Sequence, residues 1–255
     1  MTVIQSFILG ILEGATEFLP VSSTGHLILA SSLLKIQQTD FVKSFEIIIQ
    51  LGAIASVVLL YWRSFMNIAT LKKIFAAFLP TGTIGFILYK IVKTYLLGSE
   101  QTVLVALSVG GVLLIVSELL RKKEPETSVG IASVSYRKAL AIGLFQAVAV
   151  VPGVSRSAAT ILGGLLMKID RKTIVEFSFL LAVPTMLAAT GFDLVKNASA
   201  FSADQFGVLA IGFASAFIVG GASIKLFMRF IRTHTFIPFG IYRILLATVL
   251  WVTIF

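Results

Sequence analysis

The sequence predicts an all-α polytopic membrane protein with about six transmembrane helices and two re-entrant helical hairpins in an inverted-topology repeat. Three observations support this fold class. Hydrophobic residues make up 57% of the 255-residue chain, charged residues only 13%, and the mean hydropathy is +0.99. A soluble domain carries about 25% charged residues, so lipid is the expected solvent for most of this surface. The other two observations are six long apolar segments and two apolar regions that polar residues interrupt.

The six apolar segments are long enough to cross about 30 Å of hydrocarbon at a helical rise of about 1.5 Å per residue. They cover residues 45–62, 74–97, 102–120, 174–195, 206–228 and 237–255. The first residues lack the basic start and the cleavage site of a secretory signal peptide, so we expect none. The chain has no cysteine, which excludes disulfide bonds and thiol chemistry.

Two further apolar regions, residues 1–34 and 139–167, do not form simple spans. Acidic residues and Pro20 interrupt the first region, and a Pro-Gly pair interrupts the second. Each half of these regions has about 10–15 residues, the length of one arm of a re-entrant hairpin. Broken backbone at membrane depth is tolerated only where protein covers it or a wet cavity adjoins it. We therefore expect both hairpins to lie inside the protein.

The two broken regions resemble each other at an offset of 133 residues. GILE at residues 10–13 matches GLFQ at 143–146, and VSST at 21–24 matches VSRS at 154–157. Further along, FE at 45–46 matches FS at 177–178, one residue out of step. These matches indicate that the chain contains two related halves.

Three predicted spans separate the two broken regions. Because this number is odd, the second region enters the membrane from the opposite face, which is typical of an inverted-topology repeat. The sequence thus predicts a single membrane domain over residues 1–255. Its pseudo-repeats cover approximately 1–120 and 137–255, and a basic cytoplasmic linker at 121–138 joins them.

Basic residues set the predicted orientation. The loops on one side carry fourteen of them: Arg63, Lys72, Lys73, Arg121, Lys122, Lys123, Arg137, Lys138, Lys168, Arg171, Lys172, Lys225, Arg229 and Arg232. The loops on the other side carry five: Lys35, Lys43, Lys90, Lys93 and Lys196. The positive-inside rule places the side with fourteen basic residues in the cytoplasm and both termini outside. The formal charge of +9 is therefore interpreted as topology rather than as nucleic-acid binding.

Two acidic residues interrupt the first apolar region. Glu13 and Glu17 are four residues apart and would share one face of a helix. Acidic side chains inside a membrane are costly and usually functional, which favours a site over a pair of solvated helix-end carboxylates. Two carboxylates on one face could bind a divalent cation such as Mg²⁺ or Ca²⁺. Alternatively, one of them orients a histidine through a hydrogen bond.

The segment that follows combines three hydroxyls with a histidine. Pro20 stops the incoming helix, and Ser22 or Ser23 is a suitable N-cap for the next one. The free N–H groups at such a helix start form an anion site. His26 lies three residues after Ser23 on the same face, so hydroxyl and imidazole are a candidate nucleophile and base. The alternative is a capped helix with a buried structural histidine.

The second broken region repeats this design with an arginine at its tip. Arg156 lies midway through an apolar hairpin with no acidic residue nearby in the sequence. A guanidinium among hydroxyls and helix-end N–H groups suits phosphate oxygens. The alternative is an arginine that reaches a membrane surface. Residue types and spacing thus predict a membrane-embedded site for a phosphorylated, lipid-like ligand, without proving hydrolysis.

Four motifs resemble the bacterial undecaprenyl-diphosphate phosphatase family, also called the bacitracin-resistance protein family. They are EGATEFLPVSSTGH at 13–26, FEIIIQLG at 45–52, VPGVSRS at 151–157 and EFSFLLAVP at 176–184. Together they span nearly the whole chain in the order found in the family. The first motif is long, which makes the resemblance specific.

This resemblance implies an enzyme that hydrolyses undecaprenyl diphosphate to undecaprenyl phosphate and inorganic phosphate. Such an enzyme recycles the lipid carrier of peptidoglycan synthesis and confers bacitracin resistance, with a divalent cation as cofactor. Transferred by position, the implied catalytic residues are Glu13, Glu17, Ser23, His26 and Arg156, and the two glutamates are also the implied metal ligands. The implied substrate contacts are Ser22, Thr24, Gly25, Ser155, Ser157 and Thr160.

The sequence leaves several alternatives open. The nucleophile is Ser23, His26 or an activated water. The same architecture also fits a transporter or flippase of a phosphorylated prenyl lipid. An acid-phosphatase-like lipid phosphatase is disfavoured, because no histidine follows Arg156 until His234. We expect the bacterial plasma (inner) membrane, an active site open to the outer face, membrane lipids and a homodimer as candidate partners, and no nucleic acid.

Overall fold

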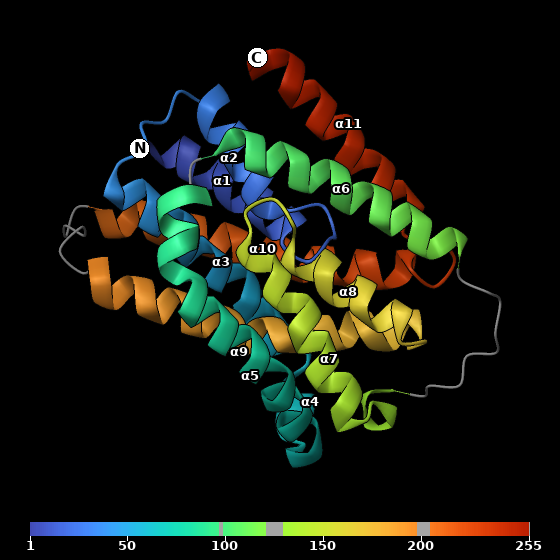
Figure 1. Cartoon of the computed structure of the whole chain (residues 1–255). Coiled ribbons are helices and arrows are strands. Elements are labelled where there is room, and N and C mark those ends of the chain that lie inside the picture. The colour runs from blue at the N-terminus through green and yellow to red at the C-terminus, as the bar shows by residue number, and fades with distance from the viewer. Residues whose placement is uncertain (97–98, 121–129, 198–204, 255) are drawn as a thin grey trace.

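The computed structural model describes residues 1–96, 99–120, 130–197 and 205–254, and this part of the chain is helical (Figure 1). The long apolar helices are α3 (Asp40–Leu60), α5 (Ile68–Ile91), α6 (Glu100–Leu119), α9 (Arg171–Asn197) and α10 (Phe206–Phe230). The shorter helices are α1 (Val3–Thr16), α2 (Ser23–Leu33), α4 (Trp62–Phe65), α7 (Tyr136–Ala147), α8 (Arg156–Leu166) and α11 (Ile237–Ile254). Short π- or 3-10-helical turns lie at Val92–Leu96, Ile131–Ser133 and Val148–Val150.

Five of the six predicted spans correspond to helices that are long and apolar enough to cross a membrane, so the protein is polytopic. The sixth, residues 237–255, forms α11, whose apolar part Ile237–Val252 is shorter. Helix α3 begins five residues before the predicted span because Thr39 accepts a capping hydrogen bond from the Val42 N–H group. The predicted linker at 121–138 lies outside the described residues over its first nine positions.

Both regions that the sequence predicts to be broken are pairs of short helices joined by a turn. The first turn, residues 17–22, separates α1 from α2, and the second turn, residues 148–155, separates α7 from α8. Ser22 and Ser155, which directly precede α2 and α8, have positive φ angles of 69° and 74°. Such angles cost a non-glycine residue about 1–3 kcal/mol. The packing around both turns must therefore hold them in place.

Each short helix before a turn packs closely on a long helix from the other half of the chain. Helix α1 lies against α10, where a Cβ atom on Gly10 would collide with the Gly212 carbonyl and the Ser215 hydroxyl. Helix α7 lies against α5, where a Cβ atom on Gly143 would collide with the Ala77 carbonyl. Small residues permit this close approach between helices in lipid. The two halves therefore interlock.

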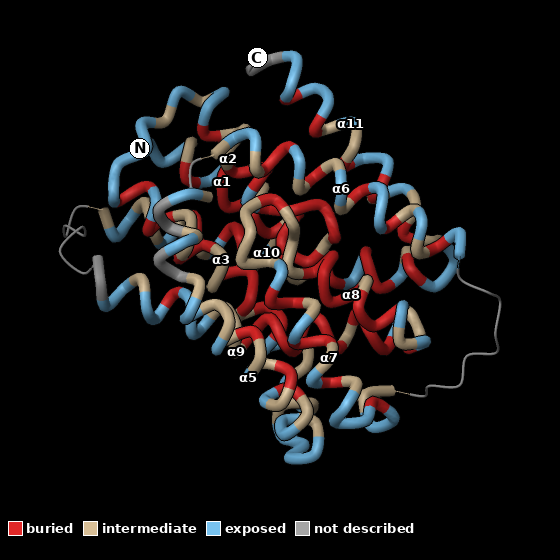
Figure 2. Tube along the Cα trace, in the orientation of Figure 1, coloured by how far each residue is buried: buried red, intermediate tan, exposed pale blue. Residues whose placement is uncertain are grey.

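Helices α6 and α11 run side by side along one edge (Figure 1), where a Cβ atom on Gly111 would lie 2.7 Å from the Gly240 carbonyl oxygen. Buried residues concentrate at the centre of the molecule (Figure 2). Phe18 in the first turn is fully buried, and its ring makes an edge contact with that of Phe179 at 5.3 Å between centroids. Large apolar side chains such as Phe86 stay exposed, which suits a lipid-facing surface.

Candidate active site

The two turns contact each other inside the protein. Arg156 Nη2 lies 2.8 Å from Glu17 Oε1, and these side chains are only 11% and 7% exposed. Ser157 Oγ donates a 2.8 Å hydrogen bond to the Phe18 carbonyl. Both contacts join residues that are 139 positions apart in the sequence. Because a buried ion pair is costly unless its other polar atoms have partners, the surroundings of this pair decide what it can do.

Glu17 also binds the hydroxyl of Ser23. Its second oxygen, Oε2, accepts a 2.7 Å hydrogen bond from Ser23 Oγ. Ser23 is the first residue of α2, and the first turn brings it back onto Glu17, six positions earlier. One carboxylate oxygen therefore holds the arginine and the other holds the hydroxyl. A carboxylate that accepts a hydrogen bond from serine is suitably placed to act as its general base.

His26 does not form the predicted pair with Ser23, because both side chains have other partners. His26 Nδ1 lies 2.8 Å from the Ser22 carbonyl, and Nε2 lies 2.6 Å from the Tyr242 hydroxyl. A carbonyl only accepts hydrogen bonds, so Nδ1 carries a proton and Nε2 of the neutral ring accepts from tyrosine. His26 thus links α2 to α11, while Ser23 faces the end of α1.

Glu13 is completely buried, and within the described chain neither of its carboxylate oxygens has a hydrogen-bond partner. The charged groups that act on it are Glu17 and Glu46, which repel a negative charge, and Arg156, which attracts one. An unpaired buried charge is very unfavourable, so this carboxyl group requires a proton or a cation.

The two predicted cation ligands, Glu13 and Glu17, therefore differ in whether their carboxylate oxygens already have partners. Glu17 has both oxygens engaged, whereas the oxygens of Glu13 are free to serve a hard divalent cation. The described residues contain no cluster of three or more His, Cys, Asp or Glu side chains that could hold a metal by themselves. A cation at Glu13 would thus need further oxygen ligands, such as water or substrate phosphate.

Arg156 is oriented by the residues around it. Its Nη1 group donates to the Ser178 carbonyl at 2.9 Å and lies 3.3 Å from the Ser178 hydroxyl. Thr160 Oγ1 donates to the Arg156 carbonyl and lies 3.0 Å from Ser178 Oγ. The Nε group is buried without a hydrogen-bond partner in the described part of the chain. One N–H group of a pre-oriented guanidinium thus remains for an anion.

The hydroxyls of the second turn and the start of α8 have structural partners. Ser155 Oγ accepts a 3.2 Å hydrogen bond from the Ala158 N–H group and caps α8. Ser157 Oγ is bonded to the first turn, as described above, and Thr160 supports the arginine. These three predicted substrate contacts therefore shape the site around Arg156, and a ligand would have to displace existing hydrogen bonds to reach them.

The predicted contacts on α2 are divided between the interior and the surface. Ser22 occupies the N-cap position, as one of the two predicted caps, but its side chain makes no capping hydrogen bond. Its carbonyl instead lies 2.8 Å from His26 Nδ1. Gly25 is buried, whereas Thr24 is exposed. Thr24 thus lies apart from the buried cluster.

Three polar residues around the site were not among the predicted site residues: Ser178 on α9, and Tyr242 and Arg243 on α11. Arg243 is fully buried and donates to the backbone of both turns. An arginine within an apolar span is costly, and this cost was a signal in the sequence. Tyr242 gave no such signal, because its contact with His26 spans 216 residues.

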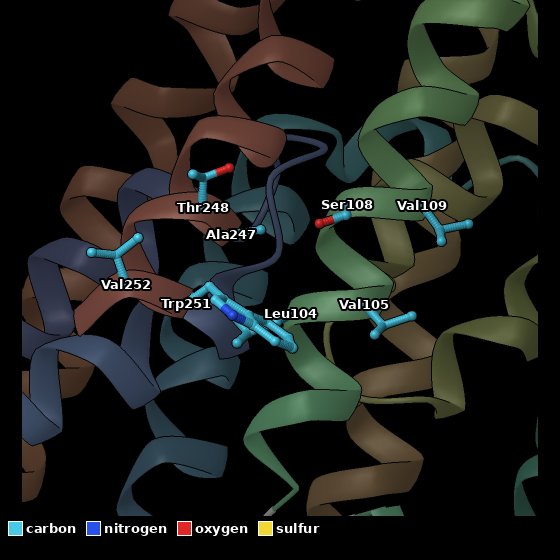
Figure 3. Close-up of a pocket in the computed structure, with 8 residues that line it drawn as sticks. All are labelled: Leu104, Val105, Ser108, Val109, Ala247, Thr248, Trp251 and Val252. Carbon is cyan, nitrogen blue, oxygen red and sulfur yellow. The ribbon is translucent and has the colours of Figure 1, made fainter. Parts of the chain in front are cut away.

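Two apolar grooves lie on the α6–α11 side of the molecule. One, of about 330 Å³, runs between these helices, where the side chains of Leu104 and Trp251 lie next to each other (Figure 3). The other, of about 130 Å³, is lined by residues of α2, α6 and α11, including Gly25 beside His26. Leu104 lines both grooves. The polar side chains described above do not line the larger groove, so it is not the chemical site.

These observations define a polytopic helical membrane protein with a buried, charged site where two broken helix pairs meet. Residues 6–249 match the family described as "Bacitracin resistance protein BacA". The chain belongs to this family, as the sequence motifs predict.

Relatives named undecaprenyl-diphosphatase match almost the whole chain. The protein of that name from Sulfurihydrogenibium sp. (strain YO3AOP1) is 53% identical over 247 residues, which cover 97% of each chain. The one from Aquifex aeolicus (strain VF5) is 50% identical over 250 residues, covering 98% of this chain and 97% of the relative. The one from Persephonella marina (strain DSM 14350 / EX-H1) is 52% identical over 248 residues, covering 97% of each.

Proposed function

We propose that this protein hydrolyses undecaprenyl diphosphate to undecaprenyl phosphate and inorganic phosphate. Nearly full-length similarity to proteins named undecaprenyl-diphosphatase supports this activity. The structural observation that carries the proposal is the Ser23 hydroxyl, which donates to a carboxylate that is also paired with Arg156. The site thus combines a nucleophile, a proton acceptor and a guanidinium group that can bind phosphate.

The terminal phosphate would bind at Arg156. The guanidinium offers its free Nε–H group and, by exchange with Glu17, its Nη2–H group to phosphate oxygens. The N-termini of α2 and α8 adjoin the two turns and supply further N–H groups for an anion. Charge-assisted hydrogen bonds of this kind stabilise the charge that spreads over the phosphoryl oxygens in the transition state.

In the first chemical step, Ser23 Oγ attacks the terminal phosphorus, and the bond from phosphorus to the bridging oxygen breaks. The serine proton passes to Glu17 Oε2, its hydrogen-bond acceptor, and undecaprenyl phosphate leaves. In the second step, water hydrolyses the phosphoserine and Glu17 returns the proton to Ser23, while one proton of the water is released. Attack by His26 or by an activated water are the two alternatives.

A divalent cation such as Mg²⁺ or Ca²⁺ fits best at Glu13, because that carboxylate is buried without a partner. When bound, the cation would neutralise negative charge on the diphosphate. Glu13 then retains its charge inside the protein, and Glu17 remains available to accept the serine proton. The two glutamates thus have separate tasks in this proposal.

The proposed membrane arrangement follows the positive-inside rule, with both termini outside a bacterial plasma membrane. The two broken helix pairs would be re-entrant hairpins of an inverted repeat. Positive φ angles support this, because they recur 133 residues apart at Ser22 and Ser155 and again at Lys35 and Lys168. The diphosphate would enter from the outer face, and its first prenyl units would lie in the smaller groove beside Gly25.

Phosphate release by the purified protein in detergent, with and without a chelator, tests the activity. We expect turnover of undecaprenyl diphosphate that stops when the chelator is added. If the lipid binds without any turnover, the transporter or flippase alternative replaces the enzyme.

Rapid quenching in denaturant at neutral pH, followed by mass spectrometry, tests the nucleophile, because phosphohistidine does not survive acid. A phosphorylated Ser23 supports the proposed step, and Ser23→Ala should then be inactive. Phosphorylated His26 would instead assign the imidazole as nucleophile. Single-turnover hydrolysis without any phosphoenzyme would assign an activated water.

A further inference from the structure

The guanidinium of Arg243 is completely buried in α11 and donates all of its hydrogen bonds to backbone carbonyls. Nε donates to Leu107 at 3.2 Å, and Nη2 donates to Ala106 at 2.9 Å, so two bonds end on α6. The remaining three end on the turns. Nη1 donates to Pro20 in the first turn at 3.2 Å and to Val154 in the second at 3.0 Å, and Nη2 donates to Gly153 at 3.0 Å. Each of the five N–H donors of an arginine therefore has a partner.

The acceptors explain why a charged group is tolerated here. The carbonyls of both turns lie outside regular helix, and a buried carbonyl without a donor is unfavourable. One rigid guanidinium fork satisfies carbonyls from both turns at once, which a shorter or neutral side chain would not do. The neighbouring helix is adapted to it, because a Cβ atom on Gly110 of α6 would collide with the guanidinium.

The turn carbonyls that accept hydrogen bonds from Arg243 lie close in sequence to the reacting groups. Pro20 stands midway between Glu17 and Ser23, and Val154 is two residues before Arg156. A movement of either turn would therefore be passed directly to the ion pair and to the serine hydroxyl. Besides the ion pair between Glu17 and Arg156, Ser157 makes one hydrogen bond to the first turn, and a single hydrogen bond does not by itself stop the turns from rotating about it.

We propose that Arg243 is the positioning residue that fixes the two turns relative to each other, so that Glu17 meets both Ser23 and Arg156. This inference rests on the proposed phosphatase function for its kinetic test only. It assigns Arg243 no contact with the substrate. A misplacement of about 1 Å at reacting groups can reduce turnover by about 10²-fold, which sets the expected effect.

Arg243→Lys is the first test variant. Lysine retains the positive charge but has three donors on a single nitrogen, so it serves fewer of the carbonyls. We expect kcat to fall about 100-fold with little change in KM, because the phosphate-binding guanidinium of Arg156 is still present. The matched control is Arg171→Lys. Arg171 on α9 forms an ion pair with the buried Glu118 on α6, away from the turns.

Gly110→Ala provides a second variant that leaves Arg243 unchanged. The added methyl group would occupy the space of the guanidinium and displace it from the carbonyls. Gly207→Ala is its control, since a Cβ atom there would meet no other atom within 4 Å. We expect Gly110→Ala to reduce kcat in the same way as Arg243→Lys, and the control to retain normal turnover.

The position of the turns can be measured without any substrate. The chain has no cysteine, so nitroxide labels can be attached at Leu33→Cys and Leu166→Cys, the exposed last residues of α2 and α8. Pulsed electron paramagnetic resonance then gives the distance between the two helices. We expect one narrow distribution in the unsubstituted background and in Arg171→Lys, and a broadened or shifted one in Arg243→Lys and Gly110→Ala.

Normal kcat in folded Arg243→Lys and Gly110→Ala would overturn the proposal, as would a loss of kcat with an unchanged label distance. The proposal would also be overturned if activity fell only in proportion to the fraction of folded protein and fell equally in the control Arg171→Lys. If the unsubstituted protein lacks phosphatase activity, the proposed function fails, while the label distances still decide whether Arg243 holds the turns.

Discussion

Replacing Glu17 by glutamine tests how Ser23 is activated. Glutamine keeps the shape of the side chain but has one acceptor oxygen, where the carboxylate offers one oxygen to Arg156 and another to Ser23. The amide oxygen can serve only one of these donors well, and the –NH₂ group faces the other. In Glu17→Gln, Ser23 therefore loses its proton acceptor even if the arginine remains hydrogen-bonded.

Two free-energy changes follow, and they appear in different measurements. General base catalysis typically contributes about 10²–10⁴-fold, so kcat should fall by that factor, equivalent to about 2.7–5.4 kcal/mol in the activation free energy. Breaking a buried ion pair costs about 3–5 kcal/mol of stability, and the retained amide–guanidinium hydrogen bond offsets part of this loss. KM should not rise, because phosphate no longer competes with a carboxylate for Arg156.

The assay is phosphate release from undecaprenyl diphosphate in detergent, with thermal unfolding measured on the same preparation. Glu118→Gln is the matched control, since Glu118 is a buried glutamate paired with Arg171 at 2.6 Å and does not contact the turns. We expect this control to lower the melting temperature but to keep kcat. A near-normal kcat in folded Glu17→Gln would refute the role of Glu17 as the base for Ser23.

Three further predictions concern single contacts of the site. Tyr242→Phe removes one hydrogen bond to His26 and should lower kcat about tenfold at most, because such a bond contributes about 0.5–1.5 kcal/mol; complete loss of phosphate release would place this pair in the chemistry. Ser157→Ala leaves the Phe18 carbonyl without a donor and should lower the free energy of unfolding by about 1–3 kcal/mol, so an unchanged melting temperature would contradict it. Glu13→Gln should weaken Mn²⁺ binding in a substrate-free paramagnetic resonance titration, and unaltered binding would place the cation elsewhere.

The helices and their breaks could be predicted because local composition determines them. Apolar runs predict six spans, of which five are long helices in the structure, and Pro20 together with the acidic residues marks the first turn. The long motif at 13–26 likewise predicted the family, which the comparison confirms. The exact helix starts were less accessible, since caps such as Thr39 lie outside the apolar runs.

The partners of the site residues could not be predicted, because they come from distant parts of the chain. Glu17 meets Arg156 across 139 residues, and Arg243 meets Pro20 across 223. For Arg243 there is a second obstacle, since backbone carbonyls have no residue type by which a sequence could reveal them. The cost of burying an arginine indicates that partners exist, but not which ones.

The two glutamates show how different side-chain partners distinguish residues that look equivalent in the sequence. Their spacing predicts a pair on one helical face, and the structure keeps this pair, because Glu17 caps α1 with helical φ and ψ angles and its N–H group donates to the Glu13 carbonyl at 2.9 Å. Glu17, at the helix end, reaches Ser23 and Arg156, whereas Glu13 stays buried without a hydrogen bond. A carboxylate with both oxygens engaged is poorly available to a cation, and one with none engaged needs a proton or a cation. We therefore predict separate tasks, with proton transfer at Glu17 and cation binding at Glu13, rather than a metal site that both share equally.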